Sequence, residues 1–280
     1  MKILNIAATA IINRIAFTIG PIMVHWYGII IATGVLLAVI LSVREGNRRG
    51  LDEENIYDYL IIGLPISIIC ARIYYVVFQW QYYSANPEMI YRIWDGGIAI
   101  YGGLIGAAIT LIIFCKHRGI SAWEFLDIVA PTVIMAQGIG RWGNFVNQEA
   151  HGVATSLAFL QNTLHLPHFI VQQMCINGTY YQPTFLYESV WDIVGFILLM
   201  ALRHRKQLFK RGEVFLTYVM WYSFGRFFIE GMRTDSLMLG PLRVSQWLSF
   251  IFFFSALAIW IVRRRKADQP WYLDQDAIKR

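Results

Sequence analysis

The sequence predicts an all-α integral membrane protein, and three observations support this fold class. Of the 280 residues, 57% are hydrophobic and only 15% are charged, whereas a typical soluble domain has about 25% charged residues. The mean hydropathy of the chain is +0.48. Apolar runs of about 20 residues, long enough to cross the ~30 Å hydrocarbon core of a bilayer, recur along the whole chain. We therefore expect a single multi-pass membrane domain, residues 1–280.

The apolar runs predict seven membrane-spanning helices, taken here in chain order. They cover residues 22–43, 59–78, 98–115, 122–140, 184–202, 213–232 and 243–262. Residues 1–21 are apolar but are interrupted by polar side chains, so we expect an interfacial helix on the outer surface. Residues 141–183 are rich in Asn, Gln, Thr and His, and a connection of this length predicts an extracytoplasmic cap. Residues 263–280 form the expected cytoplasmic tail.

The distribution of cations predicts the orientation of these helices. Most of the 24 Lys and Arg residues follow the first, third, fifth and seventh expected spans. Connections rich in Lys and Arg stay in the cytoplasm, so the N-terminus is expected outside and the C-terminus inside. The net charge of +6 is then explained by membrane topology, and no nucleic-acid partner is expected.

The outer end of the fourth expected span carries the most informative stretch, residues 140–152. A fixed cation, amides and a carboxylate at this depth are costly without a polar partner. If the helix continues, one of its faces carries Gln137, Arg141, Asn144 and Gln148. Such a face of donors beside hydrocarbon suits an anionic head group whose tails stay in the lipid.

The sixth expected span carries a second charged cluster. One helical stripe contains Tyr222, Arg226, Glu230 and Arg233. One interpretation is a structural ion pair between Arg226 and Glu230 within the helix. The other is that Arg226 and Arg141 surround a single phosphate, because the planar guanidinium binds phosphate bidentately and keeps its charge when partly desolvated.

Polar residues also begin the first and fifth expected spans. Residues 25–28 include Trp26 and Tyr27, and both residue types are typical of interfacial belts. A belt explains Trp26 as well as a site does, whereas we place Tyr27 at the site. Glu188 ends residues 182–188, and its carboxylate either caps the helix or balances an arginine. Because these clusters are expected at the outer ends of their spans, they converge at one depth.

Two features of the second and third expected spans leave alternatives open. Gly102 and Gly106 have the GxxxG spacing that lets helices approach closely. Tyr101, beside these glycines, is better explained as facing a cavity. Arg72, near the outer end of the second span, has three candidate partners: Glu188, Asp95 or a lipid phosphate.

Several common classes of site are absent from the sequence. The three cysteines, Cys70, Cys115 and Cys175, form no CxxC pair and predict no disulfide framework. HExxH, GxSxG and P-loop signatures are also missing. We therefore expect neither a metal site nor a cofactor.

These residues closely resemble the prolipoprotein diacylglyceryl transferase family over most of the chain. Residues 140–152 fit the family signature G-R-x-G-N-F-x-N-x-E-x-x-G, which is long and specific. Further matching runs occur in the same order and spacing: residues 25–28, 94–97, 182–188 and 225–230.

The resemblance implies a bacterial enzyme on the outer face of the cytoplasmic membrane. Such an enzyme transfers the diacylglyceryl group of phosphatidylglycerol to the lipobox cysteine thiol of a preprolipoprotein, the first step of lipoprotein maturation. A thioether forms and glycerol 1-phosphate leaves. By position, Arg141 would bind the lipid phosphate and Arg226 would be a second essential arginine. Together with Arg141, the residues expected to bind substrate are Tyr27, Asn144, Asn147, Gly152, Glu188, Tyr222 and Arg233.

One departure from the family pattern concerns the catalytic base. Tyr101 stands where well-known members have a histidine, and a phenol with an ordinary pKa of about 10 is a poor base. We expect Arg141 and Arg226 to stabilise the leaving phosphate, with Glu149 or Glu230 accepting a proton if one must be accepted. Tyr101 and Tyr27 would bind the lipid or orient the thiol.

A transporter or flippase for an anionic lipid or solute is the alternative function. Intramembrane arginines suit that class as well. However, the polar residues gather at the outer ends of the expected spans, whereas transporter sites usually lie near the midplane between broken helices.

Overall fold

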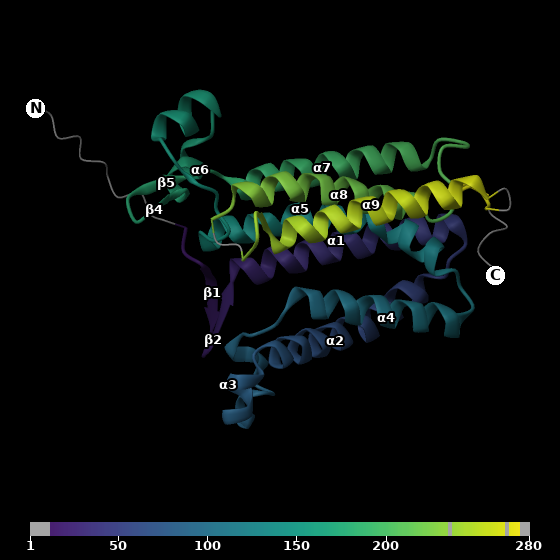
Figure 1. Ribbon diagram of the computed structural model, residues 1–280, viewed down its shortest axis with the longest axis horizontal. Coiled ribbons are helices and arrows are strands. Elements are labelled where there is room, and N and C mark those ends of the chain that lie inside the picture. Colours follow the sequence, from purple (N-terminus) through teal and green to yellow (C-terminus); the bar gives the residue numbers. More distant parts are fainter. Residues whose placement is uncertain (1–11, 235–236, 267–268, 275–280) are drawn as a thin grey trace, which may run out of the picture. The chain divides into compact units, whose positions relative to one another are not determined.

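The computed structural model describes residues 12–234, 237–266 and 269–274 (Figure 1). By their internal contacts these residues form two compact units. The first joins the chain up to Ile40 with Val129–Tyr272, and the second contains Leu41–Ile128 and the residues after Tyr272. Two helices, α1 (Trp26–Arg49) and α5 (Ala122–Asn147), each have residues in both units.

The described chain is mostly helical, as predicted. Six of its helices are long and apolar enough to cross a membrane: α1, α2 (Glu53–Phe78), α4 (Ile100–Arg118), α5, α7 (Thr184–Arg203) and α9 (Val244–Arg265). The remaining expected span is helix α8 (Glu213–Met232), which is not among the six. Glu213, Arg226 and Glu230 lower its apolar character. It packs against α7 and α9 in the first unit.

The prediction of a helix over residues 1–21 is wrong for the described residues of this segment, which contain no helix. Strands β1 (Ile15–Ile19) and β2 (Ile22–His25) form an antiparallel hairpin that leads into α1. Their β-branched and aromatic side chains favour a strand over a helix. Gly20 has a φ of +58°, so it supplies the left-handed turn residue. Residues 1–11 lie outside the described residues.

The expected cap begins later than predicted, because α5 continues through Asn147. A three-stranded sheet in the order β3-β5-β4 follows, made from Ala154–Thr155, Thr179–Tyr181 and Cys175–Ile176. Between β3 and β4 lie a turn of π-helix, η3 (Phe159–Thr163), and helix α6 (His168–Gln173).

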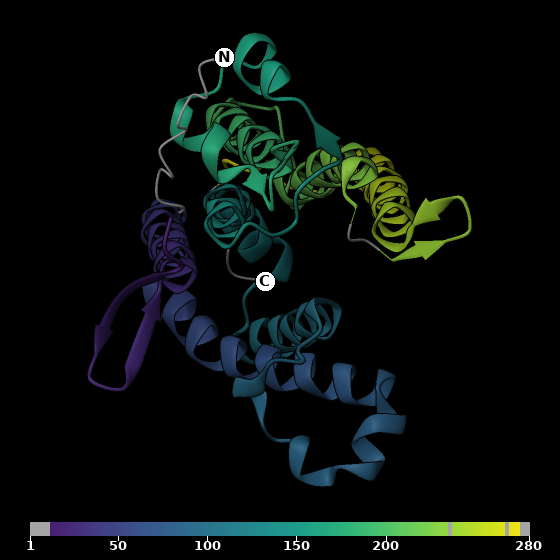
Figure 2. The ribbon, with the colours of Figure 1, turned by 90° about the vertical axis from the view of Figure 1, so that its left-hand side faces the viewer.

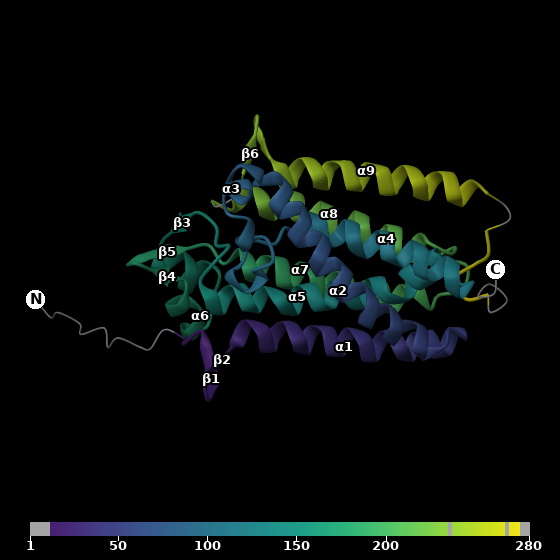
Figure 3. The same cartoon turned by 90° about the horizontal axis from the view of Figure 1, so that it is seen from below.

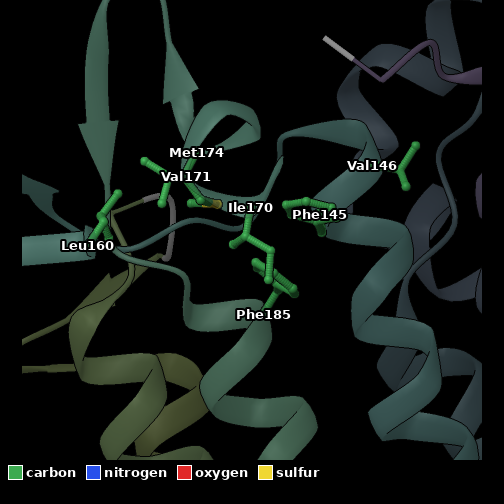
Figure 4. Packing of buried hydrophobic residues seen from close by; sticks show 7 residues of the cluster. All are labelled: Phe145, Val146, Leu160, Ile170, Val171, Met174 and Phe185. Atoms are coloured by element: carbon green, nitrogen blue, oxygen red, sulfur yellow. The ribbon is translucent and has the colours of Figure 1, made fainter. Parts of the chain in front are cut away.

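A small hydrophobic core holds the cap onto the helices. It contains Phe145, Val146, Leu160, Ile170, Val171, Met174 and Phe185. Figure 4 shows Phe145 of α5 close to Ile170 of the cap and Phe185 of α7. The rings of Phe145 and Phe185 stack with centroids 4.5 Å apart. The cap is therefore packed directly on the helix ends that carry the predicted site.

The short strands of the first unit gather at one end of its helices. Figure 3 shows the β1–β2 hairpin, the cap sheet and the hairpin of β6 (Met238–Leu239) and β7 (Leu242–Arg243) at this end. Figure 2 views the unit from this side, with the β6–β7 hairpin projecting beside α9. Helices α5 and α8 end here, and α1, α7 and α9 begin here. Within this unit, the predicted polar clusters thus lie at one depth.

In the second unit, α4 packs against α2 through the predicted glycine pair. A Cβ on Gly102 would lie 2.6 Å from the carbonyl oxygen of Cys70, and one on Gly106 would lie 2.7 Å from Cys70 Cβ. The GxxxG spacing therefore serves close packing, as expected.

Arg72 has a structural role in the same unit. All three of its guanidinium nitrogens donate hydrogen bonds to backbone carbonyls of the connection between α2 and α4, namely those of Met89, Ile90, Arg92, Gly96 and Gly97. That connection contains α3 (Trp80–Ala85) and two 3-10 turns, η1 (Pro87–Met89) and η2 (Ile93–Asp95). Within the described residues, these backbone carbonyls bind the guanidinium.

Candidate active site

Two arginines from different helices bind the same carboxylate in the first unit. Nη2 of Arg141 lies 2.7 Å from Oε1 of Glu188, and Nη1 of Arg226 lies 3.1 Å from both oxygens of Glu188. The Glu188 side chain is 4% exposed, whereas those of Arg141 and Arg226 are 21% and 16% exposed. The carboxylate is therefore buried, while both arginine side chains are partly exposed.

The ion pairs continue along α8. Nη2 of Arg226 lies 2.6 Å from Oε2 of Glu230, and Nε of Arg233 lies 3.9 Å from the same oxygen. The predicted pair between Arg226 and Glu230 is therefore present, but Arg226 also reaches across to Glu188 on α7. Removing one member of a buried pair leaves an uncompensated charge, which typically costs about 3–5 kcal/mol. The arginines are consequently held in defined positions before any ligand binds.

Three indole groups hold α5, α7 and α8 in register around this ion network. Trp142 Nε1 of α5 donates to Ser189 Oγ of α7 at 3.1 Å. Trp191 and Trp221 stack with centroids 4.3 Å apart, and each donates its indole N–H to the backbone carbonyl of the other. A Cβ on Gly225 would lie 2.2 Å from Trp191 Nε1. Only glycine fits beside this pair, one residue before Arg226.

The carboxylate of Glu149 is oriented by two amides from the end of α5. Oε1 of Glu149 accepts hydrogen bonds from Asn144 Nδ2 at 3.0 Å and from Asn147 Nδ2 at 3.4 Å. Gln148 and Ala150, on either side of Glu149, have φ values of +55° and +56°. Non-glycine residues in this region are strained, and such strain clusters at functional sites.

Neighbouring segments hold this strained turn in place. Gln148 Nε2 donates to the carbonyl of Gln173 at 2.8 Å. Thr184 Oγ1 donates to the carbonyl of Ala150 at 2.6 Å. Gln173, a further residue that no sequence motif indicates, is buried and donates to the carbonyls of Phe145 and Val146 at the end of α5. The cap and the start of α7 therefore fix the position of Glu149.

Gly152 connects the Glu149 turn to the end of α8. It forms an isolated antiparallel bridge with Arg233, and its N–H donates to the carbonyl of Gln182 at 2.9 Å. A Cβ on Gly152 would lie 2.9 Å from that of Gln182, so a larger residue would separate these strands. The glycine thus brings the Glu149 turn next to Arg233.

A small open pocket lies at this turn, within the first unit. It is lined by Asn144, Phe145, Gln148, Glu149, Ala150, His151, Met174, Ile176 and Phe185. The polar groups of the predicted motif are therefore combined with apolar side chains of the cap and of the helices α5 and α7.

The predicted tyrosines have different positions. Tyr27 packs its ring against α5, where a Cβ on Gly143 would lie 2.6 Å from its Cδ2. Tyr222 lies one turn before Arg226 on α8, where its ring stacks with that of Tyr218 with centroids 6.2 Å apart. Tyr101 is the second residue of α4 and belongs to the second unit.

Two further residues were not singled out from the sequence. His151 lies in the motif but at a variable position of its pattern, and it lines the pocket. Asp192 lies one turn beyond Glu188 on α7 and is fully buried. Within the described part of the chain, neither of its carboxylate oxygens has a hydrogen-bond partner. Its spacing of four residues from Glu188 was the signal available in the sequence.

Comparison with known proteins identifies the family of the chain. The family profile described as prolipoprotein diacylglyceryl transferase matches residues 14–262. A phosphatidylglycerol–prolipoprotein diacylglyceryl transferase of Ligilactobacillus salivarius (strain UCC118) is 65% identical over 266 residues, covering 94% of this chain and 98% of the relative. A protein of the same name from Limosilactobacillus reuteri (strain DSM 20016) is 63% identical over 269 residues, covering 96% and 97%. The chain therefore belongs to the prolipoprotein diacylglyceryl transferase family.

Proposed function

We propose that this protein transfers the diacylglyceryl group of phosphatidylglycerol to the lipobox cysteine thiol of a preprolipoprotein, forming a thioether and releasing glycerol 1-phosphate. The main support is the shared binding of Glu188 by Arg141 and Arg226, which brings two partly exposed arginine side chains together at one carboxylate. The names of the curated relatives contain the same lipid and the same acceptor class.

A lipid phosphate suits the outer faces of the two arginines. Glu188 is buried beneath them, so a phosphodiester approaches from the exposed side. Each guanidinium has donors left after it binds the carboxylate, and guanidinium groups bind phosphate oxygens in a forked geometry. Glu188 then acts as the residue that holds both cations in place for the lipid.

The difficult step is the loss of a phosphate group from the glyceryl carbon. As the thiol sulfur forms its bond to that carbon, the carbon–oxygen bond breaks and its electron pair remains on the phosphate. The phosphate therefore gains a second negative charge. Fixed donors aimed at developing charge typically contribute about 3–4 kcal/mol each in a water-excluded site. Arg141 and Arg226 supply such donors.

The other residues of the site position these groups. Glu230 accepts from Arg226 and lies near Arg233, so we assign its carboxylate to holding the two arginines. Glu149, with Asn144 and Asn147, presents polar groups for the glycerol hydroxyls of the lipid head group.

The remaining candidate residues contact the substrates. Tyr27 packs against α5, which carries Arg141, and Tyr222 lies on α8 one turn before Arg226. Gly152 keeps the Glu149 turn beside Arg233. We assign Tyr101 to hydrogen bonding with lipid or peptide.

The membrane arrangement follows the charge distribution of the chain. We infer seven spans, namely the six apolar helices and α8, which packs against α7 and α9. The N-terminus then lies outside and the C-terminus lies in the cytoplasm. The site then lies on the extracytoplasmic side of the bacterial cytoplasmic membrane, beneath the cap formed by residues 148–183. Phosphatidylglycerol reaches this site from the bilayer.

A reconstituted assay tests the proposal. The purified protein is placed in vesicles that contain phosphatidylglycerol and is given a lipobox peptide with one cysteine. We expect a diacylglyceryl peptide and glycerol 1-phosphate to appear in equal amounts. A Cys→Ser peptide and the double variant Arg141→Ala/Arg226→Ala serve as controls. Movement of lipid between leaflets with no release of glycerol phosphate would instead favour the transporter or flippase.

A further inference from the structure

The proposed reaction requires a proton acceptor, and the following argument rests on that function. The substrate thiol loses its proton, its sulfur bonds to the glyceryl carbon, and the carbon–oxygen bond to phosphate breaks. An ordinary cysteine thiol has a pKa of about 8.5, so most of it is protonated at neutral pH. A base beside the thiol therefore increases the fraction that can attack.

The acidic residues of the site are poorly suited to this task. Oxygen Oε2 of Glu230 lies close to Arg226 and Arg233, which stabilise its negative charge. Glu149 accepts two amide hydrogen bonds. Carboxylates ordinarily have a pKa near 4, far below that of a thiol, whereas imidazole ordinarily titrates near 6.5.

His151 is the imidazole that lines the pocket together with Asn144 and Glu149. Its backbone is fixed on both sides, because Thr184 Oγ1 binds the carbonyl of Ala150 and the N–H of Gly152 binds the carbonyl of Gln182. The imidazole ring packs against the ring of Tyr181, with centroids 4.1 Å apart and planes inclined by 38°. The contact with Tyr181 therefore restricts the orientation of the side chain, which lines the same pocket as Glu149.

A hydrogen bond defines which ring nitrogen of His151 is basic. Nδ1 lies 3.2 Å from the carbonyl oxygen of Gly152. A carbonyl oxygen only accepts hydrogen bonds, so Nδ1 carries the hydrogen in this contact. In the neutral ring, Nε2 then has the free lone pair. A backbone carbonyl that fixes the tautomer in this way is the usual means of preparing a histidine for proton transfer.

We propose that Nε2 of His151 accepts the proton of the substrate thiol. The thiolate attacks the glyceryl carbon, the phosphate leaves with the bonding electron pair, and the imidazolium returns its proton to solvent at the open pocket. Arg141 and Arg226 stabilise the phosphate, and His151 prepares the nucleophile. His151 is thus a further catalytic residue that contacts the peptide substrate rather than the lipid.

The test compares His151→Phe and His151→Gln with the unmodified enzyme in the reconstituted assay. Phenylalanine keeps a ring against Tyr181 but has no base. At neutral pH we expect kcat to fall about 100-fold, the size typical of a lost general base, with the KM for phosphatidylglycerol unchanged. The difference in kcat between the variants and the unmodified enzyme should decrease as the pH rises past the pKa of the substrate thiol, because the thiol then ionises without a base.

A selenocysteine peptide provides a sharper measurement. A selenol is already ionised at neutral pH, so the variants should use this peptide nearly as fast as the unmodified enzyme does. His168→Gln is the matched control, because His168 lies on α6 outside the pocket, where it contacts Gln172. We expect this control to retain full activity with both peptides.

Two results would overturn this role. Near-normal rates for both His151 variants with the cysteine peptide would exclude a base at this position. An equal loss with cysteine and selenocysteine peptides at every pH would show a structural effect instead. The proposed function fails separately, if the unmodified enzyme forms no diacylglyceryl peptide from either substrate.

Discussion

Arg141 on α5 and Arg226 on α8 bind the same carboxylate, that of Glu188 on α7. The arginines are far apart in the sequence. Helix α7, which lies between their helices in the sequence, contributes the carboxylate that binds both of them. Glu188 is nearly inaccessible, while both arginines keep an exposed part. This arrangement brings two guanidinium groups to a single carboxylate.

Replacing either arginine by lysine tests the requirement for the guanidinium group. Lysine keeps the positive charge but loses the forked donor geometry. We expect Arg141→Lys and Arg226→Lys each to lower kcat/KM about 100-fold, as is typical when a donor to a developing anion is lost. Arg48→Lys is the control, because the Arg48 side chain is 69% exposed and lies outside the site. Near-normal turnover by both site variants would refute this role.

Neutralising Glu188 should destabilise the protein in a manner that lipid reverses. In Glu188→Gln the two guanidinium groups lose their common counter-ion, so we expect a lower Tm in detergent. A bound phosphate replaces part of the missing charge. Phosphatidylglycerol should therefore raise the Tm of this variant more than that of the unmodified protein. An equal or smaller lipid effect on the variant would indicate that the phosphate binds elsewhere.

The glycine before Arg226 should not tolerate a methyl group. In Gly225→Ala the added Cβ would overlap the indole of Trp191. We expect loss of activity and a lower Tm, because α7 and α8 must separate to relieve the overlap. Gly28→Ala on α1 is the matched control, since a Cβ there has no neighbour within 4 Å. Normal stability of Gly225→Ala would contradict the described packing of the indole pair.

The phenol of Tyr101 is not expected to act as the base. Phenylalanine at this position removes one hydroxyl and keeps the ring, so Tyr101→Phe should retain most of its kcat at neutral pH. The measurement is the initial rate of diacylglyceryl peptide formation, compared with that of His151→Phe in the same vesicles. A loss of about 100-fold in Tyr101→Phe, with His151→Phe unaffected, would reverse the assignment of the general base.

Much of the fold could be predicted because the bilayer sets a simple physical requirement. Spans must be long and apolar, so the helices were expected near their observed places. The range 213–232 matches α8 although charged residues lower its apolarity. The β1–β2 hairpin was missed because its apolar composition suits an interfacial helix equally well, and only its β-branched residues and the turn at Gly20 indicate strands.

The site was predictable where its residues share one helix and less so where they do not. The spacing of Arg226 and Glu230 on one helix indicated their ion pair as one of two interpretations, and the pair is present. By contrast, the sequence left two equal roles for the Glu188 carboxylate, a helix cap or the partner of an arginine. Sequence spacing does not show which helices are neighbours, so it could not distinguish these roles. Arg72 illustrates the same limit, since its backbone carbonyl partners lie in an irregular loop that has no periodic signal.

A double-mutant cycle on Arg141 and Arg226 tests the central claim most directly. The measurement is kcat/KM for diacylglyceryl transfer from phosphatidylglycerol by the unmodified enzyme, Arg141→Lys, Arg226→Lys and the double variant. If both guanidinium groups bind one phosphate, their effects are coupled, and the double variant should lose clearly less than the product of the two single losses. Losses that multiply, as for independent sites, would contradict a shared phosphate.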